Sequence, residues 1–251
     1  MSLVPEHRTL LGIDVVKSAN NPGYHAEEIG SAVTELLTTA LSGVGIGNDD
    51  VLMREWTGDG VLLTLPGPLL GAAMDSAQLL DMAAYRRNQR RKPEIRLRVA
   101  IHVGPVADAP GYHPAKKTLN RMLDATAVKN LFDRCVAGGP DGEVSTVLIV
   151  SEHAKTTAFD GDYLRLLRIG EFSPLPVRNK EHDADTWVRV PGMDSRSIAD
   201  LLIEPGGADT VRRGDAEERA ARISVTNVVH GGGNNGVQAG VIHGDVNLGN
   251  R

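Results

Sequence analysis

Two acidic residues stand at positions where their carboxylates could take part in chemistry. Asp14 stands inside the apolar run TLLGIDVV, residues 9–16, and Asp59 stands between two glycines in TGDGV. An unpaired carboxylate in an apolar run is costly, so Asp14 should be paired, bind a metal or lie at the end of its strand. Two convergent carboxylates would suit Mg²⁺ or Mn²⁺ together with a polyphosphate. Two simpler interpretations stay open: Gly-Asp-Gly is a good turn, and Asp14 can cap the following helix.

The elements that would position these acids can be predicted from the pattern of apolar residues. Residues 9–16 predict a buried strand, and residues 26–41 have the spacing of a helix with one buried face. Residues 50–66 predict two strands joined at an Asp-Gly turn. Because the first strand of a β-α-β-β unit lies beside this hairpin, the two carboxylates can converge across adjacent strands.

The later elements complete a familiar order. We expect helices over residues 69–90 and 118–132, and strands over residues 94–104, 145–151 and 185–191. The order β-α-β-β-α-β with an α-β extension is ferredoxin-like and predicts an α+β fold. In that fold the helices cover one face of an antiparallel sheet.

Charge and composition exclude several classes of protein. The net charge of -5 argues against a nucleic-acid binder, because it gives no strong basic field. The basic run YRRNQRRK, residues 85–92, is interpreted as a solvated helix end. No apolar run reaches the ~20 residues of a membrane span, and the N-terminus has no signal-peptide pattern. We therefore expect a cytoplasmic protein without a membrane span.

The character of the sequence changes after Pro191. The segment EPGGADTVRRGDAEERAA is polar and contains Gly and Pro, which is typical of a linker. We expect one or two helical turns in SRSIADLL. The expected division is a folded domain over residues 1–191, a linker over 192–222 and a distinct terminal segment over 223–251.

Four segments carry a resemblance to a known family. LLGIDVVKSAN, WTGDGVLLTLP, IRLRVAIHVGPV and LNRMLDATAVKNL occur in the order and spacing of the class III nucleotidyl cyclase domain. They look closest to a cyclase-like branch common in actinobacteria, and KEHDADTWVRV is similar to the closing strand of that branch. The resemblance covers residues 8–190.

The resemblance implies a specific site and reaction. Asp14, Asp59 and the carbonyl of Val15 would hold two Mg²⁺ or Mn²⁺ ions over a nucleoside triphosphate, with Glu55 and Gly58 beside the substrate. The ribose 3′-hydroxyl would attack the α-phosphate and release pyrophosphate, as two-metal phosphoryl transfer allows. Arg121 of the partner subunit would stabilise charge on the α-phosphate. A head-to-tail homodimer is therefore implied.

Two departures from the family pattern affect substrate and activity. The family pattern has a purine-selecting Lys four residues before the second acid, where this chain has Glu55. The resemblance therefore does not determine which base the substrate carries, and the product could be cUMP or cCMP. An Asn is expected four residues before the Arg, where Lys117 precedes Arg121; if Asn120 is that Asn, Asp124 fills the Arg position. Neither register holds both residues. The alternatives are a catalytically inactive, cyclase-like nucleotide-binding domain and a purely assembly-driven signalling protein.

The terminal segment has a different kind of pattern. SVTNVVH and VQAGVIHGDVNL alternate on either side of GGGNNG, with little charge and no proline. This pattern is typical of segments that stack as cross-β structure, and Asn and Gln can form side-chain ladders in such a stack. A segment this short has too little apolar area to fold alone, so order would require another chain.

A second resemblance concerns the same segment. VQAG and the following VIHGDV are similar to bacterial amyloid signalling motifs that resemble the RIP-homotypic-interaction motif. The resemblance implies recruitment by a matching motif on an NLR-type receptor, in an antiphage or regulated-death pathway. A disordered glycine-rich tail is the alternative. The expected amyloid core comprises Val237, Gln238, Ala239, Gly240, Val241, Ile242, Gly244 and Val246.

Overall fold

The computed structural model describes residues 5–16, 23–58, 60–107, 113–138, 144–179 and 182–202. At residues 23–26, 179 and 182–183 it describes the backbone alone. The described residues up to Leu202 belong to one compact unit. The predictions for Asp59 and for residues 223–251 lie outside the described residues.

The centre of this unit is a seven-stranded sheet with the strand order β2-β3-β1-β4-β5-β9-β6. Neighbouring strands are antiparallel except β4 and β5, which run parallel. A separate ribbon pairs β7 (Val177–Asn179) with β8 (His182–Ala184). The mixed, mostly antiparallel sheet confirms the predicted α+β class. The strands of the sheet are β1 (His7–Val15), β2 (Met53–Trp56), β3 (Gly60–Pro66), β4 (Leu97–Pro105), β5 (Thr146–Ser151), β6 (Ser173–Pro174) and β9 (Thr186–Arg189).

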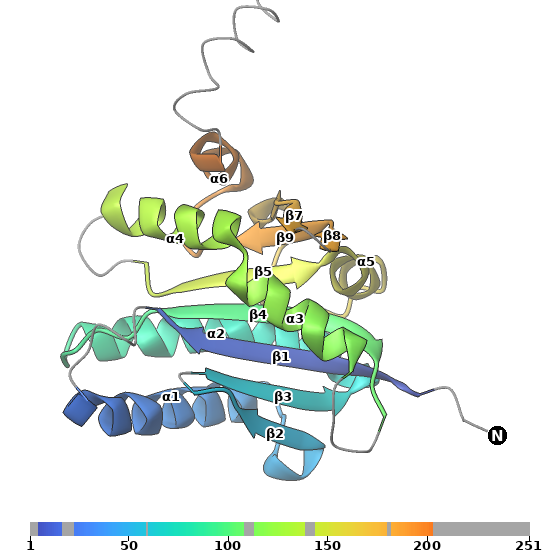
Figure 1. Cartoon of the computed structure of the whole chain (residues 1–251), viewed down its shortest axis with the longest axis horizontal. Helices are drawn as coiled ribbons and strands as arrows, with labels where there is room; N and C mark the ends of the chain where they lie inside the picture. The colour runs from blue at the N-terminus through green and yellow to red at the C-terminus, as the bar shows by residue number, and fades with distance from the viewer. Residues whose placement is uncertain are drawn as a thin grey trace, which may run out of the picture. The chain divides into compact units, whose positions relative to one another are not determined.

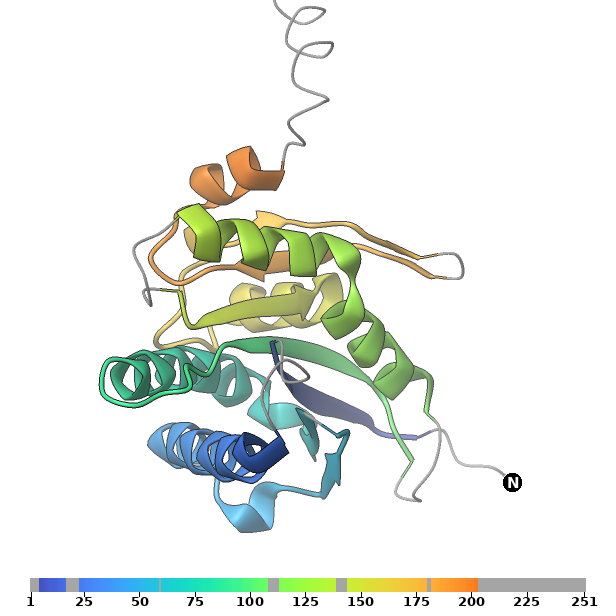
Figure 2. The ribbon, with the colours of Figure 1, turned by 60° about the vertical axis from the view of Figure 1, so that its left-hand side comes forward.

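Helices lie on both faces of the sheet, as Figures 1 and 2 show. One face is covered by α1 (Gly23–Gly43), α2 (Leu70–Asn88) and α5 (Glu152–Asp160). The other is covered by α3 (Pro114–Asp124), α4 (Thr126–Gly138) and α6 (Ser195–Leu202). Short 3₁₀ turns are η2 (Asn48–Asp50), η3 (Gly67–Leu69) and η4 (Ile169–Glu171).

The expectation that all helices share one face was wrong. Parallel strands need a crossover connection, and α3 and α4 provide it between β4 and β5. They occupy the face that α1 and α2 leave open. None of the helices in the described ranges is both long and apolar enough to cross a lipid bilayer.

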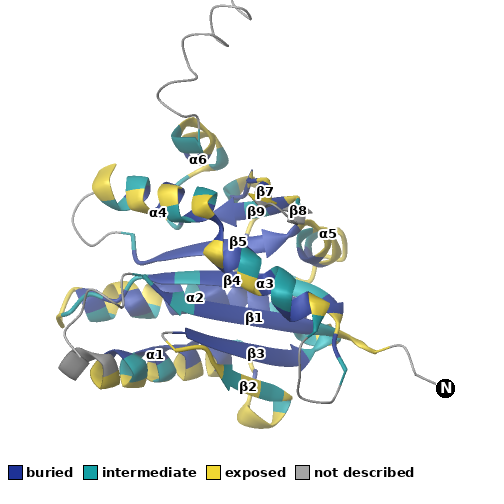
Figure 3. Ribbon diagram, in the orientation of Figure 1, coloured by how far each residue is buried: buried dark blue, intermediate teal, exposed yellow. Residues whose placement is uncertain are grey.

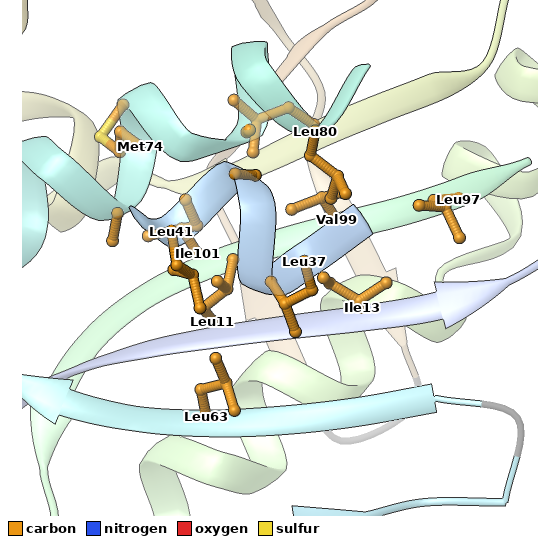
Figure 4. Packing of buried hydrophobic residues seen from close by; sticks show 14 of the residues in the cluster. Leu11, Ile13, Leu37, Leu41, Leu63, Met74, Leu80, Leu97, Val99 and Ile101 are labelled. Carbon is orange, nitrogen blue, oxygen red and sulfur yellow. The ribbon is translucent and has the colours of Figure 1, made fainter. Parts of the chain in front are cut away.

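The alternation of β1 divides the apolar core into two layers. Leu11, Ile13 and Val15 pack with α1 and α2, and Figure 4 shows this layer from close by. Leu10 packs in the other layer, which includes α3 and α4. Figure 3 shows β1, β3, β4 and β5 as largely buried strands between the two layers of helices. Because β1 is buried on both faces, an acid at its end is held in a defined place.

The helix expected over residues 118–132 is two helices. Ala125 interrupts it with φ -57 and ψ 126, outside the helical region, and α4 begins at the next residue. Leu119 and Met122 of α3 and Val128 and Leu131 of α4 are all buried in the same apolar layer. The break thus lets two short helices cover one face, and this packing overrides the continuous helical spacing of the sequence.

Candidate active site

Asp14 lies at the end of β1, between two neighbouring strands. Its register partners are Gly60 on β3 and Arg98 on β4. Arg98 donates from Nε to Asp14 Oδ2 over 2.8 Å and from Nη2 to the same oxygen. The side chains are 13% exposed for Arg98 and 19% for Asp14. The carboxylate predicted to need a partner therefore has a guanidinium across the strand pair.

The hairpin beside Asp14 forms as predicted, with glycines at its tip. Thr57 N donates to Gly60 O over 3.0 Å, and Gly58 has a φ of +84°, which glycine adopts without strain. A Cβ on Gly60 would lie 2.4 Å from Ile13 O, so the close approach of β3 to β1 requires glycine. Asp59 lies outside the described residues, but it is bonded to Gly60, which is directly opposite Asp14.

The side chains at this end of the sheet can be compared with the ligands that a divalent metal ion requires. Asp14 supplies the oxygen donors that Mg²⁺ and Mn²⁺ prefer. Val15 packs its side chain, 5% exposed, into the core below. Within the described ranges, no group of three or more His, Cys, Asp or Glu side chains could hold a metal. The donor chemistry of Asp14 fits a hard divalent cation, and Asp59 is the candidate for the second carboxylate.

A cavity of about 490 Å³ lies between the hairpin and α3. It brings together Glu55 with the three residues of α3 that the sequence singled out, Lys117, Asn120 and Arg121. Three of its ten lining residues are basic, which suits an anionic ligand. The remaining lining residues are Trp56, Thr57, Leu62, His113, Lys116 and Asp124.

Lys116 is the residue of this cavity that the sequence analysis missed. Its Nζ donates to Glu55 Oε2 over 2.5 Å and lies 3.2 Å from Met53 Sδ. The side chains are 8% exposed for Lys116 and 38% for Glu55. The sequence does indicate that Lys116 lies on the buried face of the helix, because Lys116, Leu119 and Leu123 follow the 3–4 spacing of one helix face. A buried ammonium needs a counter-charge, and Glu55 provides it.

Arg98 was missed for a different reason. The alternation in residues 94–104 places Arg98 on a strand, but it does not show which strand lies beside it. The pairing with Asp14 follows from the register of β1 with β4. His102 lies on the same strand, with its Nδ1 2.9 Å from Ser151 Oγ.

A second cavity, of about 690 Å³, lies between α2, α4 and α6. Its lining includes Asp81 and Cys135 and none of the residues that the sequence singled out as a site. Burial raises the pKa of the Asp81 carboxyl, while a hydrogen bond from Thr146 lowers it. Burial raises the pKa of the Cys135 thiol to about 11, so the nucleophilic thiolate is scarce at neutral pH. We therefore assign the candidate site to Asp14, the hairpin and the smaller cavity.

Comparisons with known proteins bear on the fold. Neither a scan against protein-family models nor a search of curated proteins gave a match. Solved structures did match: a bacterial light-regulated adenylyl cyclase has a TM-score of 0.52 and 11% identity over 80% of this chain and 58% of that one. An adenylate/guanylate cyclase/hydrolase from Silicibacter pomeroyi has a TM-score of 0.51 and 20% identity over 76% of this chain and 100% of that one.

The identities in these comparisons are low, and the shared property is the fold. A second structure of a bacterial light-regulated adenylyl cyclase gives a TM-score of 0.51 at 11% identity. This chain spans little more than half of the first cyclase and the full length of the second. The described unit thus has the fold of adenylyl and guanylyl cyclase domains.

Proposed function

We propose that this chain is a nucleotidyl cyclase of class III, which converts a nucleoside triphosphate into a 3′,5′-cyclic nucleotide and pyrophosphate. The observation that carries the proposal is Asp14 at the end of β1, directly opposite Gly60 of the Gly-Asp-Gly hairpin. The cyclase fold of the described unit supports the proposal.

Asp14 and Asp59, with the carbonyl of Val15, would hold two Mg²⁺ or Mn²⁺ ions. When bound, such ions activate the ribose 3′-hydroxyl and neutralise phosphate charge. Arg98 fixes the Asp14 carboxylate through its two hydrogen bonds. Its guanidinium adds positive charge at the place where the phosphates of a substrate would lie.

Glu55 is the proposed contact to the base. Lys116 holds one oxygen of its carboxylate, so the group is oriented and can accept a hydrogen bond from an N–H of the base. Gly58, at the hairpin tip, lets the backbone approach the substrate closely. Which base is preferred is decided by comparing the four nucleotides.

Lys117, Asn120 and Arg121 would serve the transition state. All three line the cavity next to the hairpin. Arg121 would stabilise charge on the α-phosphate, and Lys117 would add a second cation where the family pattern has an amide. We propose that α3 presents them to the site of the other subunit in a head-to-tail homodimer.

The test is a cyclase assay with each of the four nucleoside triphosphates and Mn²⁺ or Mg²⁺, analysed by chromatography. At least one nucleotide should give a cyclic product, and Asp14→Asn should reduce its formation by a factor of about 100 or more. Asp160→Asn, on the exposed end of α5, is the matched control and should keep full activity. Nucleotide binding without product from any of the four would favour the inactive alternative.

We propose further that residues 223–251 recruit the enzyme into an immune signalling assembly through an amyloid motif. The support is the sequence alone: the alternation around GGGNNG and the VQAG segment. A receptor with a matching motif would template the stack. Assembly would raise the local concentration of the cyclase domain and drive its dimerisation.

Deletion of residues 223–251 tests this coupling. The full chain should gain activity when it assembles, and the isolated segment should form thioflavin-positive fibrils. The truncated chain should need a higher protein concentration for the same specific activity. Equal activity of the full and truncated chains at low concentration would show that assembly through the segment does not activate the cyclase.

A further inference from the structure

A basic loop leads from α2 into β4 at the Asp14 end of the sheet. Residues 86–92 hold five cations and no acid, in a chain of net charge -5. The strand that follows begins beside the end of β1: Leu97 is the register partner of Val15, and Val16 N donates to Arg96 O over 2.9 Å. Figure 1 shows the C-terminal end of α2 at the same end of the sheet as the arrowhead of β1.

The two ends of this loop are fastened together. Asn88 Nδ2 donates to Ile95 O over 2.8 Å, and Ile95 N donates to Asn88 Oδ1 over 2.9 Å. Arg87 turns back and donates from Nη1 to Pro93 O over 2.7 Å. Asn88 is 6% and Ile95 0% exposed. The loop therefore projects from a buried clamp, which gives its other cations a defined position.

These other cations face solvent. Arg86, in the last turn of α2, is exposed, as are Arg90, Arg91 and Lys92 of the loop itself. Lys92 forms an ion pair with Glu94, but no carboxylate of the described part of the chain pairs with Arg86, Arg90 or Arg91. The charge of the three arginines is thus directed outward, at the end of the sheet where Asp14 lies.

We propose that a basic surface, the steering loop, attracts the polyphosphate of the substrate toward the Asp14 end of the sheet. The steering loop comprises Arg86, Arg90, Arg91 and Lys92. The inference rests on the proposed cyclase function. A nucleoside triphosphate is anionic, and the net charge of -5 of the chain as a whole disfavours its approach. A local positive potential raises the local substrate concentration and the association rate. It acts within the ~10 Å screening length of 0.1 M salt.

A pair of charge reversals isolates this effect. Arg90→Glu with Arg91→Glu reverses the loop, while Arg165→Glu with Arg168→Glu makes the same change in net charge elsewhere. Arg165 and Arg168 are exposed, and Arg165 N is bonded to Asp75 in the first half of α2. From Asp75 to Asn88 the helix rises about 20 Å. The control thus lies far from the Asp14 end.

The measurement is the association rate constant of methylanthraniloyl-labelled nucleoside triphosphates, followed by stopped-flow fluorescence. At about 20 mM salt the loop variant should associate about tenfold more slowly than wild type, and the control within twofold of it. At about 0.5 M salt the difference should vanish, because screening removes steering. The turnover number at saturating substrate should stay unchanged, and circular dichroism should show both variants folded.

Four outcomes would overturn the proposal. Equal rates for all three proteins, or equal slowing of both variants, would exclude steering by this loop while nucleotide binding still supports the site. No binding of any labelled nucleotide by wild type would remove both the proposed function and the steering. Loss of duplex DNA or phosphatidylserine vesicle binding in the loop variant, with unchanged nucleotide association, would assign the loop to another anion.

Discussion

At the scale of residues, the ion pair of Asp14 with Arg98 is the contact that holds the carboxylate of the candidate site in place. Arg98→Met leaves a mostly buried carboxylate without its guanidinium, which should lower the free energy of unfolding by about 2 kcal/mol. Urea denaturation measures this. Added to Asp14→Asn, the same substitution should cost much less, because no charge is then left uncompensated. Additive losses would mean that the two side chains do not interact in solution.

Some residues of the candidate site could be predicted from the sequence, and others could not. Asp14 and the glycines of the hairpin could be found from an acid in an apolar run and from Gly-Asp-Gly. Lys116 could have been found from its spacing with Leu119. Arg98 could not, because its role depends on which strands are neighbours, and that is a property of the whole sheet.

At the scale of elements, the approach of β3 to β1 can be tested through Gly60. Gly60→Ala places a Cβ 2.4 Å from Ile13 O, so the strands must separate beside Asp14. We expect a loss of about 1–3 kcal/mol in unfolding free energy together with a loss of activity. Gly30→Ala is the matched control, since its Cβ meets nothing within 4 Å on α1. It should stabilise the helix by about 0.5–1 kcal/mol. A stable, active Gly60→Ala protein would contradict the register described.

The link between α2 and β5 predicts a dependence of stability on pH. Burial raises the pKa of Asp81 above its ordinary value of 3.8, so the folded state holds this proton more tightly than the unfolded state. The stability contributed by protonated Asp81 is complete below that value and is lost as pH rises through the raised pKa.

Asp81→Asn removes this titration and keeps an acceptor for Thr146 Oγ1, which donates to Asp81 Oδ1 over 2.9 Å. The variant should therefore gain stability relative to wild type as pH rises from about 4 to about 7. Thermal unfolding across that range measures the difference. A constant difference at all pH values would show that the folded-state pKa is not raised.

The elements also explain what the pattern of the sequence left open. The first six elements were predicted with the correct order, because each has its own apolar period and turn residues. The break at Ala125 and the second layer of helices were not. The second layer follows from the parallel pairing of β4 with β5, which requires a crossover that no local pattern shows. The break follows from the packing of α3 and α4 in one apolar layer.

At the scale of the whole molecule, the proposed site is complete when two subunits meet. Asp14 and Asp59 would come from one copy, and Arg121 of α3 from the other. The chain has a net charge of -5, whereas the steering loop is basic, and in our proposal the loop guides the anionic substrate. The tail beyond residue 223 would act at a further level, by bringing copies together.

The most direct test of this composite site is complementation between two inactive variants. Asp14→Asn and Arg121→Ala should each be inactive alone. Mixed in equal amounts after dissociation and reassociation, half of the dimers pair one copy of each and have one intact site. Cyclic nucleotide formation should then recover to about a quarter of the wild-type rate. No recovery in mixed dimers, verified by differential tagging, would contradict a site shared between subunits.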